Sequence, residues 1–167
     1  MSIPDPGLNA AVRETLSKPA GPLTLRDLLT LTNLNASFRD VKSLEGLGAA
    51  HNLIRLFLGR NQLANVVFPE GLTNLKTLYL DQNQMTDLAL PSDLTNLASL
   101  ELGNNQLTNL SVRADLPSLS NLHLDNNPLI NFAFLSPNAE FELVQHPRHN
   151  SNHQPHLACR SDEFDQI

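Results

Sequence analysis

Leucines recur along this chain at a constant interval of 22 residues. The first leucines of four successive copies are Leu53, Leu75, Leu97 and Leu119. In the middle of each copy, leucines alternate with other residues, which is the pattern of a short strand with one buried face. One copy cannot bury its leucines alone, so the pattern predicts coils that stack side by side with their strands paired in parallel.

Each copy follows the pattern L-x-x-L-x-L-x-x-N-x-L, which resembles the leucine-rich repeat family. One example comprises Leu75, Leu78, Leu80, Asn83 and Met85. Leucine supplies 34 of the 167 residues and asparagine supplies 19, as such a repeat requires. The resemblance implies an α/β repeat fold, a right-handed solenoid with a parallel β-sheet on its concave face.

A column of asparagines falls where the chain must turn out of each predicted strand. Its members are Asn61, Asn83, Asn105 and Asn127. An amide side chain can pair with backbone groups of a neighbouring coil that would otherwise be buried without a partner. We therefore expect a buried structural ladder at this column rather than a functional site.

The second half of each copy predicts short strands or irregular coil on the convex face. Apolar residues are spaced by two there, whereas a helix needs spacings of three and four. The pairs expected to point inward are Val66 and Phe68, Leu88 and Leu90, Leu110 and Val112, and Phe132 and Phe134.

Residues 1–30 predict a helical N-terminal cap, which an open solenoid needs because its first coil otherwise exposes its leucines. Leu8, Val12 and Leu16 have the spacing of an amphipathic helix. Thr24-Leu25-Arg26-Asp27 has the form of a capping box that opens a short second helix. The motifs I-P-D-P-x-L from Ile3 and L-x-G-L from Leu44 resemble the N-terminal cap of bacterial internalin-like proteins.

The solenoid is expected to span residues 31–145. Its first coil is degenerate, because Arg39 takes the place of the asparagine. Four 22-residue repeats follow, and Phe141 and Val144 continue the period into a partial last coil with one more strand. Residues 146–167 lack periodicity, and we expect them to form a polar, histidine-rich tail that is flexible or covers the edge of the last coil. The core residues of the degenerate coil are Leu31, Leu34, Ala36 and Val41.

Charge and composition exclude several classes of protein. A net charge of −6 without a concentrated basic segment argues against nucleic-acid binding. The single cysteine, Cys159, rules out an internal disulfide. No apolar run approaches the length of a membrane span, and Met1–Gly7 lacks the pattern of a secretory signal. We expect a monomer without membrane insertion. The family resemblance implies a secreted or cell-surface protein, whereas a chain that is complete as given would be cytoplasmic.

The sequence predicts neither catalysis nor a cofactor. It contains no Gly-rich phosphate loop, metalloprotease helix motif or nucleophile elbow, so we expect no enzyme and assign no catalytic residue. Histidine clusters can bind zinc, nickel or copper. The tail contains such a cluster, but nothing in an aperiodic segment predicts tetrahedral convergence, so a solvated tail is favoured over a metal site. The weak candidates are His146, His149, His153 and His156.

The alternation also predicts which side chains face outward from the concave sheet. Because Leu56 and Leu58 point inward, Arg55 and Phe57 point to the other side, and adding the period extends these columns. A nearly flat face suits a protein partner better than a small molecule, which needs a deep pocket. We predict that a protein partner binds across Arg55, Phe57, Arg60, Thr77, Tyr79, Asp81, Ser99, Glu101, Asn121, His123 and Asp125.

Two features of this face have alternative interpretations. Phe57 and Tyr79 should stand side by side as exposed aromatics, either as anchors of a binding surface or as a merely stabilising cross-strand pair. Residues 1–60 carry 7 − 5 = +2 charges and residues 61–145 carry 2 − 9 = −7. This gradient orients a partner of the opposite polarity, or it serves solubility alone.

The sequence thus favours a non-catalytic protein-recognition module whose partner binds the concave face. The internalin-like resemblance implies a bacterial surface or host-interaction protein. Two alternatives remain open, namely an intracellular scaffold or regulatory subunit and a metal-binding function of the histidine-rich tail.

Overall fold

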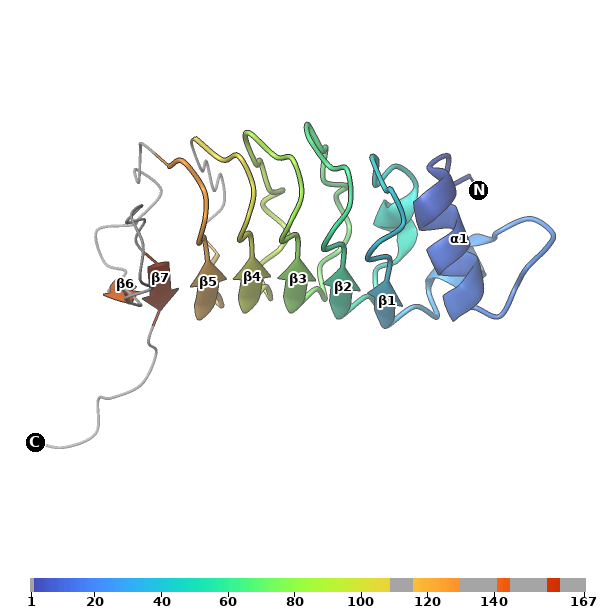
Figure 1. The fold of residues 1–167 in the computed structure, drawn as a ribbon. Helices are drawn as coiled ribbons and strands as arrows, with labels where there is room; N and C mark the ends of the chain where they lie inside the picture. The colour runs from blue at the N-terminus through green and yellow to red at the C-terminus, as the bar shows by residue number, and fades with distance from the viewer. Residues whose placement is uncertain (1, 109–115, 130–140, 145–155, 160–167) are drawn as a thin grey trace, which may run out of the picture.

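The 22-residue period becomes one coil of a solenoid, and each coil adds one short strand to a common sheet (Figure 1). The computed structural model describes residues 2–108, 116–129, 141–144 and 156–159, the last two ranges as backbone. The predicted solenoid with a parallel sheet and a helical cap is confirmed. Its elements are α1 (Pro6–Thr15), α2 (Leu25–Leu28), β1 (Asn33–Asn35), η1 (Leu47–Ala49), β2 (Arg55–Phe57), β3 (Thr77–Tyr79), β4 (Ser99–Glu101), β5 (Asn121–His123), β6 (Phe141–Val144) and β7 (His156–Cys159).

The main sheet pairs β1 to β5 in chain order, and every pair is parallel. The central residue of each strand is a leucine that points into the core, and no more than 1% of any of these side chains is exposed. These leucines are register partners from coil to coil, so they form one buried row. The row comprises Leu34, Leu56, Leu78, Leu100 and Leu122. The degenerate first coil is therefore a true coil of the solenoid.

The asparagine column forms the buried ladder that the sequence predicts. Asn83 shows the pattern, since its Nδ2 donates to the carbonyl of Leu80 in its own coil and to that of Leu58 in the preceding coil, both at 3.0 Å. Its Oδ1 accepts the backbone N–H of Leu63 at 3.1 Å. Asn61, Asn105 and Asn127 make equivalent bonds. Each asparagine thus joins two coils.

A second, exposed ladder, which the sequence analysis did not identify, lies at the residue before the first leucine of each coil. Each of its side chains donates to a backbone carbonyl of the preceding coil. Asn74 Nδ2, for example, donates to the carbonyl of His51 at 2.9 Å. The other members are Asn52, Asn96 and Ser118.

The cap is tied to the first coils by one buried carboxylate. Asp5 is the N-cap of α1, and its Oδ1 accepts the N–H of Leu8 at 2.9 Å. Its Oδ2 accepts the N–H groups of Lys42 at 2.8 Å and Ser43 at 3.2 Å. Only 7% of Asp5 is exposed, and Leu8 is fully buried. The same carboxylate therefore begins the helix and fixes it against the solenoid, beside β1 (Figure 1).

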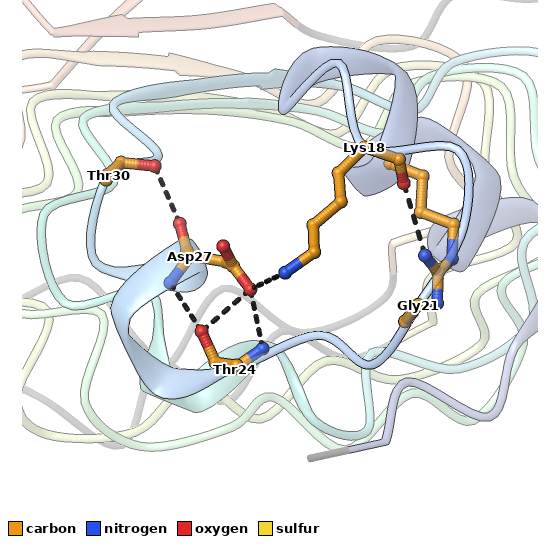
Figure 2. A network of polar contacts seen from close by, with 6 residues as sticks. Lys18, Gly21, Thr24, Asp27 and Thr30 are labelled. Atoms are coloured by element: carbon orange, nitrogen blue, oxygen red, sulfur yellow. Dashed lines mark hydrogen bonds and ion pairs between the residues drawn. The ribbon is translucent and has the colours of Figure 1, made fainter.

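The capping box of α2 is part of a wider polar network in the cap (Figure 2). The Oδ2 atom of Asp27 accepts from the Thr24 backbone N–H and hydroxyl, both at 2.7 Å, and pairs with Lys18 Nζ at 2.6 Å. Arg13, in α1, donates to the carbonyls of Lys18 at 3.1 Å and Gly21 at 3.0 Å. These bonds hold the loop between the two helices.

This network predicts an acid-sensitive cap. The hydrogen bond from Lys18, followed by those from Thr24, lowers the pKa of Asp27 from 3.8 to about 2. Because the folded pKa lies below the unfolded value, the stabilisation is present above about pH 4 and is lost as the pH falls through about 2. Melting temperatures measured across this range should fall more for the wild type than for Asp27→Asn. Parallel curves for the two proteins would contradict the assignment.

The convex side of the described coils matches the sequence prediction in part. Phe68, Leu88 and Leu90 are buried, while Val66 is half-buried against the same core. No helix forms on this side within residues 64–70 and 86–92. The remaining predicted pairs, Leu110 with Val112 and Phe132 with Phe134, lie outside the described residues.

The C-terminal region differs from the expected continuation of the solenoid. The predicted extra strand exists as β6, but it pairs antiparallel with β7 in a separate sheet instead of extending the parallel one. His156–Cys159, which belong to the segment expected to be flexible or to cover the edge of the last coil, form β7. A strand needs partners for its backbone N–H and C=O groups, and β6 offers an edge for β7. β7 lies beside β5 at this end of the molecule (Figure 1).

No helix in the part of the chain that the structure describes is both long and apolar enough to span a membrane.

Candidate functional site

The structure brings all the predicted partner-binding residues to one face of the molecule. They lie on β2 to β5 or in the turn directly after each strand, and register pairing places each column side by side across the coils. We call this outward side of the sheet the concave face. Arg55, Arg60, Asn121 and His123 are exposed there. The others are half-buried, namely Phe57, Thr77, Tyr79, Asp81, Ser99, Glu101 and Asp125.

Phe57 and Tyr79 form a stacked aromatic pair at the centre of the basic end of this face. They are register partners on β2 and β3, with ring centroids 5.0 Å apart and an interplanar angle of 23°. Both are half-buried rather than fully exposed, because each ring covers part of the other. The stacking is the cross-strand contact named in one of the two interpretations of this pair. It leaves the outer side of the pair open to solvent.

The degenerate first coil adds residues to the face that the sequence analysis did not include. Asn33 Oδ1 accepts from Arg55 Nη1 at 3.3 Å, and Asn35 is the register partner of Phe57. Phe38 is exposed and lies against Arg60. Subtracting the 22-residue period once more from the predicted columns would have found all three.

Glycine and aspartate alternate in the column that follows the strands. Gly59 and Gly103 are buried because the carboxylates of Asp81 and Asp125 lie against them. A Cβ atom at Gly59 would come within 2.6 Å of Asp81 Oδ1, and one at Gly103 equally close to Asp125 Oδ1. The two carboxylates therefore lie flat on the face, two coils apart.

The C-terminal end of the face carries an acid–imidazole contact. His123 Nδ1 lies 2.7 Å from Glu101 Oε2, between register partners on β5 and β4. Ser99 Oγ donates to the other carboxylate oxygen of Glu101 at 3.4 Å. Glu101, Asp81 and Asp125 make the C-terminal end of the face acidic. Arg55 and Arg60 lie at the end nearer the N-terminal cap, so the predicted charge gradient is present on the face itself.

The turn at one edge of the concave face, which we call the rim, has an unusual backbone. Its residues adopt positive φ angles between 54° and 59° without being glycine. They are Phe38, Arg60, Gln82, Asn104 and Asn126, one from each coil. The residue after each of the last four is a ladder asparagine, so the same turn that buries the ladder turns the rim side chains outward.

The described residues contain no cluster of side chains suited to a metal ion. Among residues 2–108 and 116–129, no three histidine, cysteine, aspartate or glutamate side chains come together as a metal site would require. The candidate ligands His146, His149 and His153 lie outside the described residues. His156 begins β7, which is described as backbone alone.

Comparison with known protein families identifies the repeat. Residues 51–96 and 73–113 match the family model described as Leucine Rich repeats (2 copies). A search of curated proteins finds no match.

The solved structures that this chain matches include bacterial proteins. An internalin of Listeria monocytogenes is 25% identical, with a TM-score of 0.53 over 78% of this chain and 46% of the internalin. This chain therefore spans just under half the length of that protein. Internalin C2 of the same species is 26% identical, with a TM-score of 0.37 over 80% of this chain and 89% of that one. A leucine-rich repeat protein of Leptospira interrogans is 28% identical, with a TM-score of 0.39 over 64% of this chain and 34% of that one.

Proposed function

We propose that this chain, which is a leucine-rich repeat protein with an internalin-like fold, acts as a protein-recognition module that holds its partner on the concave face. Leucine-rich repeat proteins bind protein partners, and stacked repeats present an extended regular surface suited to this task. The proposal involves no catalytic step, cofactor or nucleic acid, and it treats the chain as a monomer.

The stacked Phe57–Tyr79 pair is the observation that carries the proposal. Tyrosine and phenylalanine are enriched in protein interfaces, where rigid aromatic side chains lose little conformational freedom on binding. The pair is held in one geometry by the parallel register of β2 and β3. Cations flank it on one side and carboxylates on the other, so charge fixes the direction in which a partner lies across it.

The double variant Phe57→Ala, Tyr79→Ala is expected to weaken partner binding at least about tenfold, which corresponds to about 1.4 kcal/mol. Both central leucines of the strands remain, so the fold should be kept. The partner is first isolated as a protein retained by the immobilised wild type. The affinity of this partner for the wild type and for the double variant is then measured by calorimetric titration.

Val67→Ala provides the matched control. Val67 is 85% exposed and lies on the convex side, so its loss removes exposed apolar surface without touching the concave face. The control should bind as the wild type does. Equal affinity of the double variant and the wild type would discard the proposed binding face.

The likeness to the Listeria monocytogenes internalin supports a second part of the proposal, that the module acts at a bacterial surface on a protein of a host or a neighbouring cell. Antibody labelling of intact cells of the source organism tests this. Labelling of intact cells is expected. Labelling only after the cells are permeabilised would favour the intracellular scaffold.

A further inference from the structure

Phe38 and Arg60 form an exposed cation–π pair at the rim of the concave face. Phe38 lies in the turn after β1, one period before Arg60. Its side chain is 69% exposed, and the guanidinium carbon of Arg60 lies 4.9 Å from the centroid of its ring. This pair lies outside the Phe57–Tyr79 stack on which the proposed function depends.

Phenylalanine is a poor choice for this turn on structural grounds. Its φ of 59° is the left-handed value shared by the whole rim, which asparagine tolerates and bulky side chains rarely adopt. Asn104 and Asn126 occupy the matching positions two and three coils beyond Arg60. The exposed ring adds nothing to the core. Asparagine would therefore suit the fold better than phenylalanine at this position.

The contact with Phe38 does not use the N–H donors of Arg60. A guanidinium stacks by its face, and its N–H donors point outward in the plane. Within the described residues, the Arg60 side chain takes part in no hydrogen bond or ion pair, while its backbone N–H donates to the Asp81 carbonyl at 2.9 Å. Arg39, by contrast, pairs with Glu14, and Arg13 donates to Lys18 and Gly21.

We propose that Phe38 and Arg60 form a subsite for an acidic segment of the protein partner. A carboxylate of the segment pairs with the free edge of Arg60, and a neighbouring apolar side chain covers the ring of Phe38. The guanidinium already lies over the Phe38 ring, so binding has to restrict fewer of the rotatable bonds of Arg60. This inference rests on the proposed function. It adds that the part of the partner bound at the basic end of the face is acidic.

Charge complementarity places the acidic segment at this end of the solenoid. Residues 1–60 carry 7 − 5 = +2 charges, whereas residues 61–145 carry 2 − 9 = −7. An acidic segment is therefore attracted to the rim at Arg60 and repelled from Glu101 and Asp125 farther along the stack. Asp40, two residues after Phe38, accepts from Gln62 Nε2 at 2.6 Å and forms no ion pair with Arg60.

The test is an NMR titration of the labelled full chain with acetyl-Gly-Glu-Leu-Glu-Gly-amide and with the same peptide carrying lysine in place of glutamate. The acidic peptide should saturably shift the Arg60 Nε–Hε signal and the Phe38 ring signals, and the basic peptide should not. Phe38→Asn, which suits the left-handed turn, and Arg60→Gln should each weaken binding by about two- to fivefold. Arg26→Gln removes the same charge from the exposed surface of α2 and should leave the affinity unchanged.

Three results would overturn the inference. They are the absence of a saturable shift at Arg60, equal shifts with the basic peptide, and tighter binding of a short single-stranded oligonucleotide at the same residues. The first of these results, if accompanied by shifts confined to Phe57 and Tyr79, would reject the inference while leaving the proposed function intact. The proposed function fails separately, if the Phe57→Ala, Tyr79→Ala variant keeps full affinity for its isolated partner.

Discussion

Asp5→Ala is expected to lower the free energy of unfolding by about 2–4 kcal/mol. The substitution removes the N-cap of α1 and leaves the backbone N–H groups of Lys42 and Ser43 without their acceptor. Because neighbouring coils of a solenoid stabilise one another locally, the loss should fall first on the cap. Amide hydrogen exchange should therefore accelerate in α1 while β3 and β4 stay protected.

Two variants serve as controls for this prediction. Asp5→Asn keeps one acceptor oxygen, so it should lose less stability than Asp5→Ala. Glu45→Ala removes a carboxylate from an exposed residue of the same region and should change the free energy of unfolding by less than about 0.5 kcal/mol. If Asp5→Ala unfolds with the midpoint of Glu45→Ala, then the carboxylate does not join the cap to the solenoid.

Asn83→Ala is expected to destabilise the chain by about 1–3 kcal/mol. The two shared carbonyls keep a partner, since Leu58 also accepts from Asn61 and Leu80 also accepts from Asn105. The buried N–H of Leu63 does not, because Asn83 Oδ1 is its acceptor. Asn74→Ala, in the exposed ladder, is the matched control and should cost less, because water can replace its bond. Denaturant unfolding of both variants tests the difference.

Asn83→Asp separates the donor from the acceptor role of this side chain. The acceptor for Leu63 remains, but a buried carboxylate oxygen then faces the carbonyls of Leu58 and Leu80. We expect a larger loss than for alanine at neutral pH. Burial raises the pKa of the introduced carboxyl above its unfolded value, so the penalty should shrink as the pH falls. Equal stability of the two variants at neutral pH would show that the amide donor is dispensable.

The sheet and its outward columns could be predicted because they follow from one repeated interval. Leu56 and Leu78 occupy equivalent positions in their coils, so they became register partners, and their outward neighbours Phe57 and Tyr79 became neighbours too. The capping box at Thr24 could be identified because its bonds are local. In these cases a side chain's position depends on the period or on residues a few positions away.

Other features depend on contacts that no period encodes. β7 forms because β6 offers it an antiparallel edge, and the tail carries no alternation that signals this pairing. Asp5 reaches Lys42 and Ser43 across more than one coil of chain. The contact between Phe38 and Arg60 could have been inferred from the period, but the predicted columns began at Arg55 and did not include the first coil.

Amide chemical-shift mapping of the full chain with its isolated partner tests the binding face most directly. We expect the shifts to concentrate on Arg55–Phe57, Thr77–Tyr79 and the rim residues that follow these strands. Shifts confined to residues 64–70 and 86–92 of the convex side, with the two strands unaffected, would contradict it.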